Sequence, residues 1–342
     1  MITGNKIPLT LSAFAFAIGL LTTSVSAKTY DWQLPENGSL TINIPRGALL
    51  IVTRDDGKPL VSLDLQKIDI SRESTLTTRK ITGDIPSEEP QWLVNGQAAT
   101  LTLPTPADID LQKVKGVTAA ISLPKSGQYD INGTLSNIYL KGTKNNLRIN
   151  VVNGKVIAQN AAAGTVSIDV MNGSISTEAM KSDLSLKLRS GSLTDKGSDG
   201  AMNIDLVSGD LTLNSSAKSI NIRQTTGKQT IDALASETFS NDLQTGSGTV
   251  RLGIPLVKGQ IFSADGEITT IIPAGWQGNI VANGVTGNNI VNKLSEQKPI
   301  PVKPPLSDER LELVQGQARV SQITLSTIGG VFTIQPSEAG SK

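Results

Sequence analysis

The sequence lacks cysteine and histidine altogether, and its only aromatic residues are 5 Phe, 3 Trp and 3 Tyr among 342 residues. Without Cys and His there can be no disulfide, no thiol nucleophile, no Ser-His-Asp triad and no Cys/His zinc site. The chain also has no large excess of either charge, because 31 Lys and Arg residues nearly balance 30 Asp and Glu residues. A nucleic-acid-binding protein would need an excess of cations to neutralise phosphates, so we expect no nucleic-acid partner. Hydrophobic residues still make up 38% of the chain, so a core of Val, Ile, Leu and Ala can form.

The first 27 residues have the features of a secretory signal peptide. Lys6 is followed by the apolar run 9–21, and small polar residues then lead to Ala27. The apolar run has about 13 residues, whereas a membrane-spanning helix needs about 20. We therefore expect cleavage after Ala27 and no membrane span in the mature chain. The protein would be exported in a bacterium, to the periplasm, the cell surface or the medium.

Short segments that end in glycine recur along the chain at a nearly constant interval. Leu184–Gly191 and Met202–Gly209 are two examples, and the residue before each such glycine is usually small and polar. Intervals of about 18 to 21 residues over many repeats are typical of a solenoid, whose repeats bury their apolar faces against each other. We expect each glycine to form a corner between two strands. The predicted corner glycines are Gly133, Gly154, Gly173, Gly191, Gly209, Gly227, Gly246, Gly266, Gly284 and Gly330.

Apolar residues alternate with polar residues inside each repeat. Leu186 and Leu188 would point one way and Lys187 the other, which is the period of a β-strand rather than of a helix. Two or three short strands separated by corners fill about 18 residues. The sequence therefore predicts an all-β fold, a parallel β-solenoid (β-helix) with coils of about 18–21 residues.

The outward residue between the two apolar positions forms a row from coil to coil. In stacked parallel strands such residues become neighbours, and opposite charges there attract weakly, by about 0.2–1 kcal/mol per pair. The row could also be read as catalytic or calcium-binding carboxylates. We interpret it as structural, because a calcium site needs converging oxygen ligands with no cation between them. This outward ladder consists of Asn150, Asp169, Lys187, Asp205, Arg223 and Asp242.

Differences in residue composition and strand pattern divide the mature chain into regions. Residues 28–127 contain strand-like segments between Pro, Gly and charge clusters, and we expect them to form a β-rich N-terminal cap. The solenoid repeats would occupy 128–336, leaving 337–342 as a tail. The segment 295–319, rich in Pro and charge, predicts an exposed extended loop inserted within one coil.

These features resemble the bacterial putative-adhesin family of β-strand repeats, a domain-of-unknown-function group. The resemblance rests on three stretches: 38–45, 119–127, and the Asn/Ser/Thr-Gly repeats that end at 325–330. It covers nearly all of the mature chain. It implies an exported β-solenoid in the cell envelope, and it supplies no catalytic residues.

Two classes of function fit this sequence. The first is a non-catalytic exported cell-envelope protein, an adhesin-like binding or scaffolding module whose partner is an envelope protein or a glycan. An envelope-stress scaffold would look the same in sequence. For this class we expect no catalytic, cofactor-binding or metal-ligating residues.

The second class is a β-helical polysaccharide-active enzyme, a lyase or hydrolase, whose chemistry needs only carboxylates and cations. Asp108 and Asp110 are the candidate acids, but Lys113 and Lys115 follow closely, so we interpret this segment as a solvated mixed-charge loop. Sugar-binding clefts usually offer aromatic rings, and we interpret Tyr30, Trp32 and Trp276 as cap or corner packing instead.

Overall fold

The computed structural model describes residues 28–72, 77–80, 89–104, 116–162, 164–303, 308–316 and 321–337. The predicted signal peptide 1–27 and the candidate acids Asp108 and Asp110 lie outside these ranges, so their predictions stay untested. The described residues form strands and turns without a helix, which confirms the all-β prediction.

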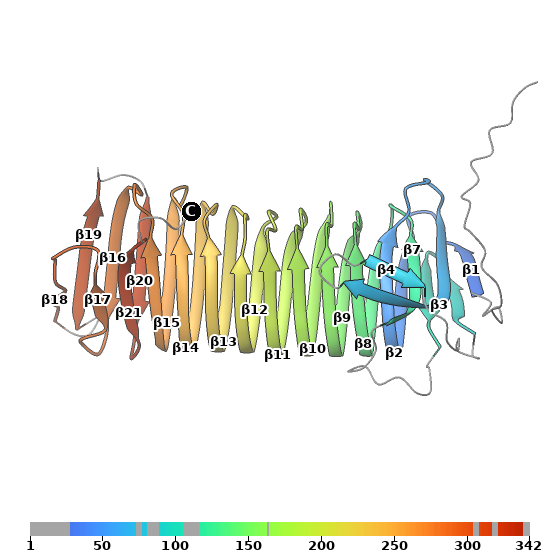
Figure 1. Ribbon diagram of the computed structural model, residues 1–342, viewed down its shortest axis with the longest axis horizontal. Helices are drawn as coiled ribbons and strands as arrows, with labels where there is room; N and C mark the ends of the chain where they lie inside the picture. Colours follow the sequence, from blue (N-terminus) through green and yellow to red (C-terminus); the bar gives the residue numbers. More distant parts are fainter. Residues whose placement is uncertain are drawn as a thin grey trace, which may run out of the picture.

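The strands belong to one long sheet, drawn as a rod in Figure 1. Its mostly parallel strands, stacked along the rod, are consistent with the predicted solenoid. The strands are β1 Lys28–Gln33, β2 Ser39–Thr53, β3 Leu60–Arg72, β4 Thr77–Lys80, β5 Gln91–Asn95, β6 Ala98–Thr102, β7 Gly116–Leu123, β8 Gln128–Lys141, β9 Asn146–Gln159, β10 Thr165–Glu178, β11 Asp183–Lys196, β12 Met202–Asn214, β13 Ser219–Ala233, β14 Thr238–Leu252, β15 Lys258–Ile272, β16 Gly278–Gly284, β17 Ile290–Asn292, β18 Ile300–Pro301, β19 Glu309–Gln315, β20 Gln322–Thr327 and β21 Val331–Pro336.

Strands β8 to β15 stack in chain order, and each pairs in parallel with the next. Thr165, for example, pairs with Asp183, so equivalent positions of successive strands lie side by side. The turns between the strands also hydrogen-bond to each other, as where the Asp199 N–H donates to the Met180 carbonyl oxygen at 2.9 Å. We call each of these strands with its following turn a coil.

Each of these strands turns a corner near its middle. In β11, Leu184, Leu186 and Leu188 are buried, and the next buried residues are Leu193 and Asp195. The buried residues therefore have even numbers up to 188 and odd numbers from 193 onward. This break in the alternation marks the corner. The two halves of the strand then enclose a narrow core, which the small aliphatic residues of this chain can fill.

The N-terminal end of the rod departs from chain order. Strand β2 pairs in parallel with β8 on one edge, and its other edge pairs with β6 and β7. The first long strand of the chain therefore lies between strands that follow it in sequence. Antiparallel strands then complete this end, with β3 on β7, β1 on β3 and β5 on β6.

The C-terminal end repeats this arrangement. Strands β20 and β21 pair with β15 on one side and with β16 and β17 on the other. The last coil of the chain is thus inserted between two coils that precede it. The segments on either side of the predicted loop 295–319 accordingly lie in two different coils that pair with each other.

Part of that loop is itself a strand, where the sequence analysis expected an exposed extended segment. Residues 309–315 form β19, which pairs antiparallel with β16 and covers its outer edge. The physical reason is an alternating pattern, in which Leu311 and Leu313 are buried while Arg310 and Glu312 are exposed.

Candidate functional site

The strand register aligns most of the predicted corner glycines in one column. Gly154, Gly173, Gly191, Gly209, Gly227, Gly246 and Gly266 pair in succession, and the first six of these have φ between +132° and +149°. The Cβ position of Gly330 would lie 2.1 Å from the Gly266 carbonyl oxygen, which places Gly330 beside this column.

Two predicted corner glycines lie outside the column. Gly133 pairs with Val151 and Gly284 with Thr327, so both occupy positions that precede the corner. In β8 the corner position belongs to Ser136, which pairs with Gly47. The Ser136 hydroxyl donates to the Ile44 carbonyl oxygen at 2.9 Å, so a buried side chain replaces glycine in that coil.

The register also brings the outward ladder together. Asn150, Asp169, Lys187, Asp205, Arg223 and Asp242 follow one another across β9 to β14. No ion pair joins these six described residues, whereas ion pairs do form on another outward row. There, Glu178 lies 3.6 Å from Lys196 and Asp232 lies 3.4 Å from Arg251. We call the surface that carries the outward ladder the ladder face.

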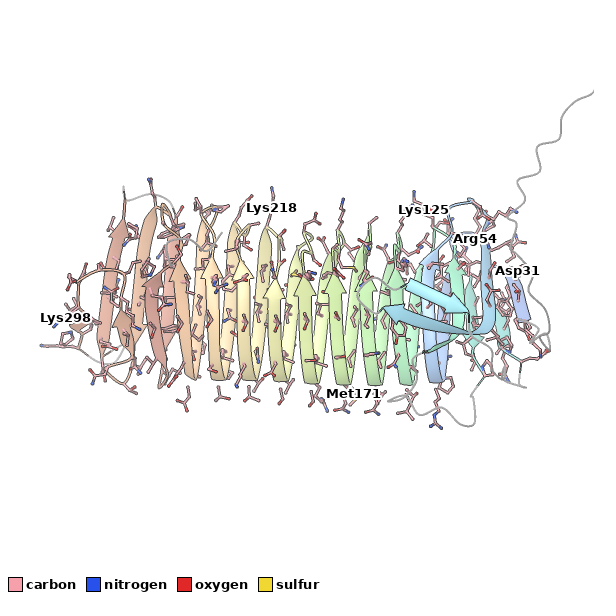
Figure 2. All side chains as sticks on the ribbon, in the orientation of Figure 1. Asp31, Arg54, Lys125, Met171, Lys218 and Lys298 are labelled. Atoms are coloured by element: carbon pink, nitrogen blue, oxygen red, sulfur yellow. The ribbon has the colours of Figure 1, made fainter. Side chains whose placement is uncertain are left out.

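Another outward row also lies beyond the corner, next to the row with the ion pairs, and was missed from the sequence. Its members are a serine and six threonines at equivalent positions of β10 to β15 and β21. Threonine, which is β-branched and carries a short hydroxyl side chain, suits the outer side of a strand. Its members are Ser176, Thr194, Thr212, Thr230, Thr249, Thr269 and Thr333. Figure 2 shows the side chains along the rod, with Met171 on one long edge and Lys218 on the other.

The ladder face is hollowed where the inserted strand β20 meets β15. In the row of the ladder, Asp242 pairs with Phe262, which pairs with Ser326. A hollow of about 290 Å³ lies here, and a second hollow of about 490 Å³ adjoins it through Gln260 and Thr324. We call the first hollow the β15 groove. The outward side chains that line it are Ser240, Asp242, Gln260, Phe262, Thr324 and Ser326.

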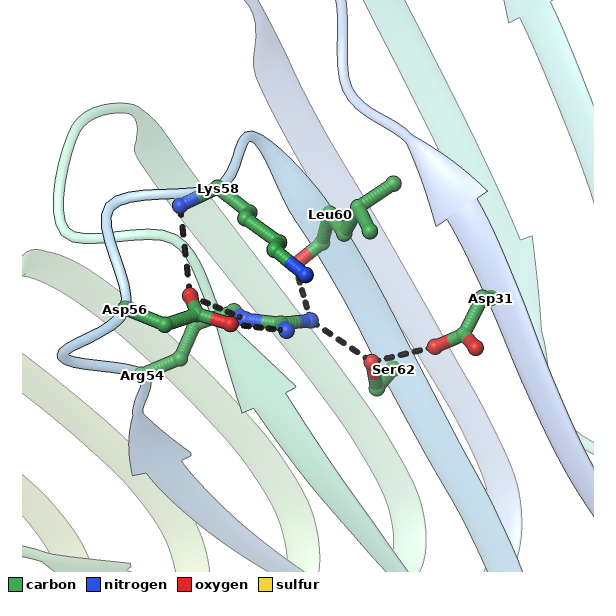
Figure 3. A network of polar contacts seen from close by, with 6 residues as sticks. All are labelled: Asp31, Arg54, Asp56, Lys58, Leu60 and Ser62. Atoms are coloured by element: carbon green, nitrogen blue, oxygen red, sulfur yellow. Dashed lines mark hydrogen bonds and ion pairs between the residues drawn. The ribbon is translucent and has the colours of Figure 1, made fainter. Parts of the chain in front are cut away.

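A network of polar contacts lies at the N-terminal end of the rod (Figure 3). Arg54 donates to both carboxylate oxygens of Asp56, at 2.9 and 2.6 Å, and to the Ser62 hydroxyl oxygen at 2.7 Å. The Ser62 hydroxyl in turn donates to Asp31. The hydrogen bond from Arg54 lowers the pKa of Asp56 to about 2. Through these contacts the Arg54 side chain ties β1 to the β2–β3 turn.

Stacked aromatic rings cover the core at the same end. Tyr30 and Trp32 stack with ring centroids 5.6 Å apart, and Trp32 and Trp92 stack at 5.1 Å. All three rings are partly buried and pack against the core. Trp276 is buried elsewhere, and its indole N–H donates to the Leu256 carbonyl oxygen at 3.0 Å. These aromatic side chains therefore pack in the core or close its end, as the sequence analysis interpreted Tyr30, Trp32 and Trp276.

Two buried polar clusters were also missed from the sequence. Asp195 is 1% exposed, and it accepts hydrogen bonds from the hydroxyls of Thr177 and Ser198. Burial raises the pKa of the Asp195 carboxyl despite these bonds. Farther along the core, the amides of Gln224, Gln229 and Asn241 bond to one another. Both clusters lie inside the rod, so we interpret them as structural.

Within the described ranges, no group of three or more acidic side chains could hold a metal ion. The part of the chain that the structure covers also contains no helical segment suited to span a membrane.

Comparison with known proteins gives distant matches only. No protein-family model matches the sequence, and neither does any curated protein. A solved structure of a putative cell adhesion protein from Clostridium sporogenes is 11% identical, with a TM-score of 0.25, covering 91% of this chain and 99% of that one. A putative adhesin from Bacteroides fragilis is also 11% identical, with a TM-score of 0.34, covering 92% and 98%.

Proposed function

We propose that this protein is a non-catalytic, exported cell-envelope protein that acts as an adhesin-like binding or scaffolding module. The observation that carries the proposal is the ladder face, on which six polar side chains from β9 to β14 stand in register. Each coil pairs with a neighbour on both sides, so the spacing of these side chains is held by the backbone. A stiff, repeated surface of this kind is suited to binding or assembly.

The expected partner is a glycan or an envelope protein, and the signal peptide expected from residues 1–27 would bring the chain to it. The polar groups at the ends and in the core support the same proposal. Arg54, Asp56 and Asp195 are engaged in contacts that stabilise the rod, rather than being free to act on a substrate.

Binding to whole bacterial cells and to their envelope fractions tests this proposal. Residues 28–342 would be purified, incubated with cells, and measured for retention after washing. Lys187→Glu and Arg223→Glu alter exposed positions of the ladder face and should weaken retention if that face binds. Deleting 295–319 is a poor control, because it would remove β19 and uncover β16. If the wild-type chain is not retained by any cell or envelope fraction, the proposal fails.

The enzyme hypothesis remains separately testable. Polyanionic polysaccharides would be incubated with the purified chain and their products measured. Turnover that is lost in Asp110→Ala would overturn the proposal of a non-catalytic role.

A further inference from the structure

The β15 groove has a composition unlike the rest of the ladder face. We propose that it binds a neutral carbohydrate chain, an inference that rests on the proposed binding function and names its ligand class. The groove exists because β20 is inserted beside β15, which sets Thr324 and Ser326 next to Gln260 and Phe262.

The floor of the groove is rich in free hydrogen-bonding groups. The hydroxyls of Ser240, Thr324 and Ser326 can each donate and accept, and so can the amide of Gln260. None of these four side chains has a hydrogen-bond partner among the residues that the structure describes. A sugar, whose hydroxyls also donate and accept, would satisfy them without leaving a buried polar group unpaired.

Phe262 supplies the apolar contact that such a site needs. It stands in the outward row between Asp242 and Ser326, where the preceding members of the row are polar. Its side chain is half-buried, so part of it is open to the groove. An aromatic ring at an outward position can pack against the C–H face of a sugar ring while the neighbouring groups bond its hydroxyls.

Charge and size favour a neutral glycan over other ligands. Asp242 is the only charged side chain among the described residues that line the groove, and one of its oxygens already accepts from the Gln244 amide at 2.6 Å. The described residues that line the groove itself include no Lys or Arg, so an anionic ligand would lack a counter-charge there. The groove crosses β14, β15 and β20, about 10 Å at the usual strand spacing, and it lacks the larger apolar centre of a protein interface.

An array of immobilised neutral oligosaccharides tests the proposal, followed by calorimetric titration of any glycan that binds. Phe262→Leu keeps apolar volume and removes the ring, and Gln260→Ala changes an exposed side chain that the fold does not require. We expect each to weaken binding at least about tenfold. Thr212→Ala, which alters an exposed side chain beyond the corner and outside the ladder face, is the matched control and should leave the affinity unchanged. Thermal melting verifies that all variants are folded.

The inference is overturned if no neutral glycan binds, or if binding is unchanged in Phe262→Leu and Gln260→Ala. It is also overturned if cell binding is lost when the cells are treated with protease but survives removal of their glycans, since the partner is then a protein. In each of these cases, retention of the wild-type chain by cells would leave the proposed function standing. Loss of both glycan and cell binding would contradict both proposals.

Discussion

The Cβ position of Gly191 would lie 1.7 Å from the carbonyl oxygen of Gly173 in the neighbouring coil. No side chain tolerates that distance, and Gly191 also has a φ of +136°, which L-residues rarely adopt. The same approach recurs down the column, because each corner brings one backbone against the next. Glycine is therefore required at this position for two reasons: the positive φ and the close approach of the neighbouring backbone.

Gly191→Ala should destabilise the protein by about 3 kcal/mol or more, since it adds a steric conflict with the backbone to the strain of a positive φ. Unfolding in urea, followed by circular dichroism, measures the loss. Gly197→Ala is the matched control. Gly197 also has a positive φ, of +70°, but has no atom within 4 Å of its Cβ position, so we expect a cost of about 1 kcal/mol. Equal costs for the two variants would mean that contact between corners does not matter.

The buried Asp195 should make stability depend on pH. Burial raises its folded-state pKa above the unfolded value, so the folded protein holds the proton more tightly than the unfolded chain does. The stability from this group is then fully present below the unfolded pKa and is lost as pH rises through the folded pKa. Asp195→Asn has no charge to bury at any pH. We therefore expect the wild-type chain to gain stability relative to Asp195→Asn as the pH is lowered.

Thermal melting of both proteins over a series of pH values measures that difference. Asp205→Asn is the control, because Asp205 is exposed on the ladder face. The expectation would be contradicted if the difference in melting temperature between wild type and Asp195→Asn stayed constant with pH. It would also be contradicted if that difference grew in favour of the wild type as pH rises.

Gln229 and Asn241 should be coupled energetically. The Asn241 amide donates to the Gln229 oxygen at 2.8 Å, and both side chains are buried. Gln229→Leu leaves the Asn241 amide without that partner, which costs about 1–3 kcal/mol. Adding Asn241→Ile should restore part of this loss, because its neighbours Ile222 and Ile261 in the same core row are aliphatic.

A double-mutant cycle from urea unfolding measures the coupling between these two residues. We expect the double variant to be more stable than the sum of the two single changes predicts. Strict additivity would show that the bond between the two amides contributes nothing.

The architecture could be predicted because each coil repeats a local pattern of alternating residues and a corner glycine. The order of the coils could not, since a strand with this pattern fits any position in the stack. Gln322 pairs with both Lys258 and Asn279, and no local feature of the sequence selects that position. The β15 groove was missed for the same reason, because Phe262 and Ser326 become neighbours only when β20 is inserted.

Interior polar residues were missed because they break the expected alternation. Asp195 occupies an inward position that is apolar in the next coil, where Leu213 pairs with it. A charged residue there looks like a surface residue until the corner at Gly191 is placed. Gly133 shows the opposite error, because it was predicted to form a corner and does not. It follows Asn132, just as other corner glycines follow small polar residues, but the corner of that strand is at Ser136.

Glu309 should stabilise the exposed edge of β17 at the C-terminal end of the rod. Its carboxylate accepts the backbone N–H of Ile290 at 2.8 Å and also that of Asn289, at the start of β17. In the described residues β17 pairs only with β21, so its other edge would otherwise expose these donors. Glu309→Ala should cost about 1–3 kcal/mol and increase aggregation, as measured by urea unfolding and light scattering. Glu309→Gln keeps an oxygen acceptor, so it should lose less stability than Glu309→Ala. If the two variants behave alike, the donors of β17 are not what Glu309 satisfies.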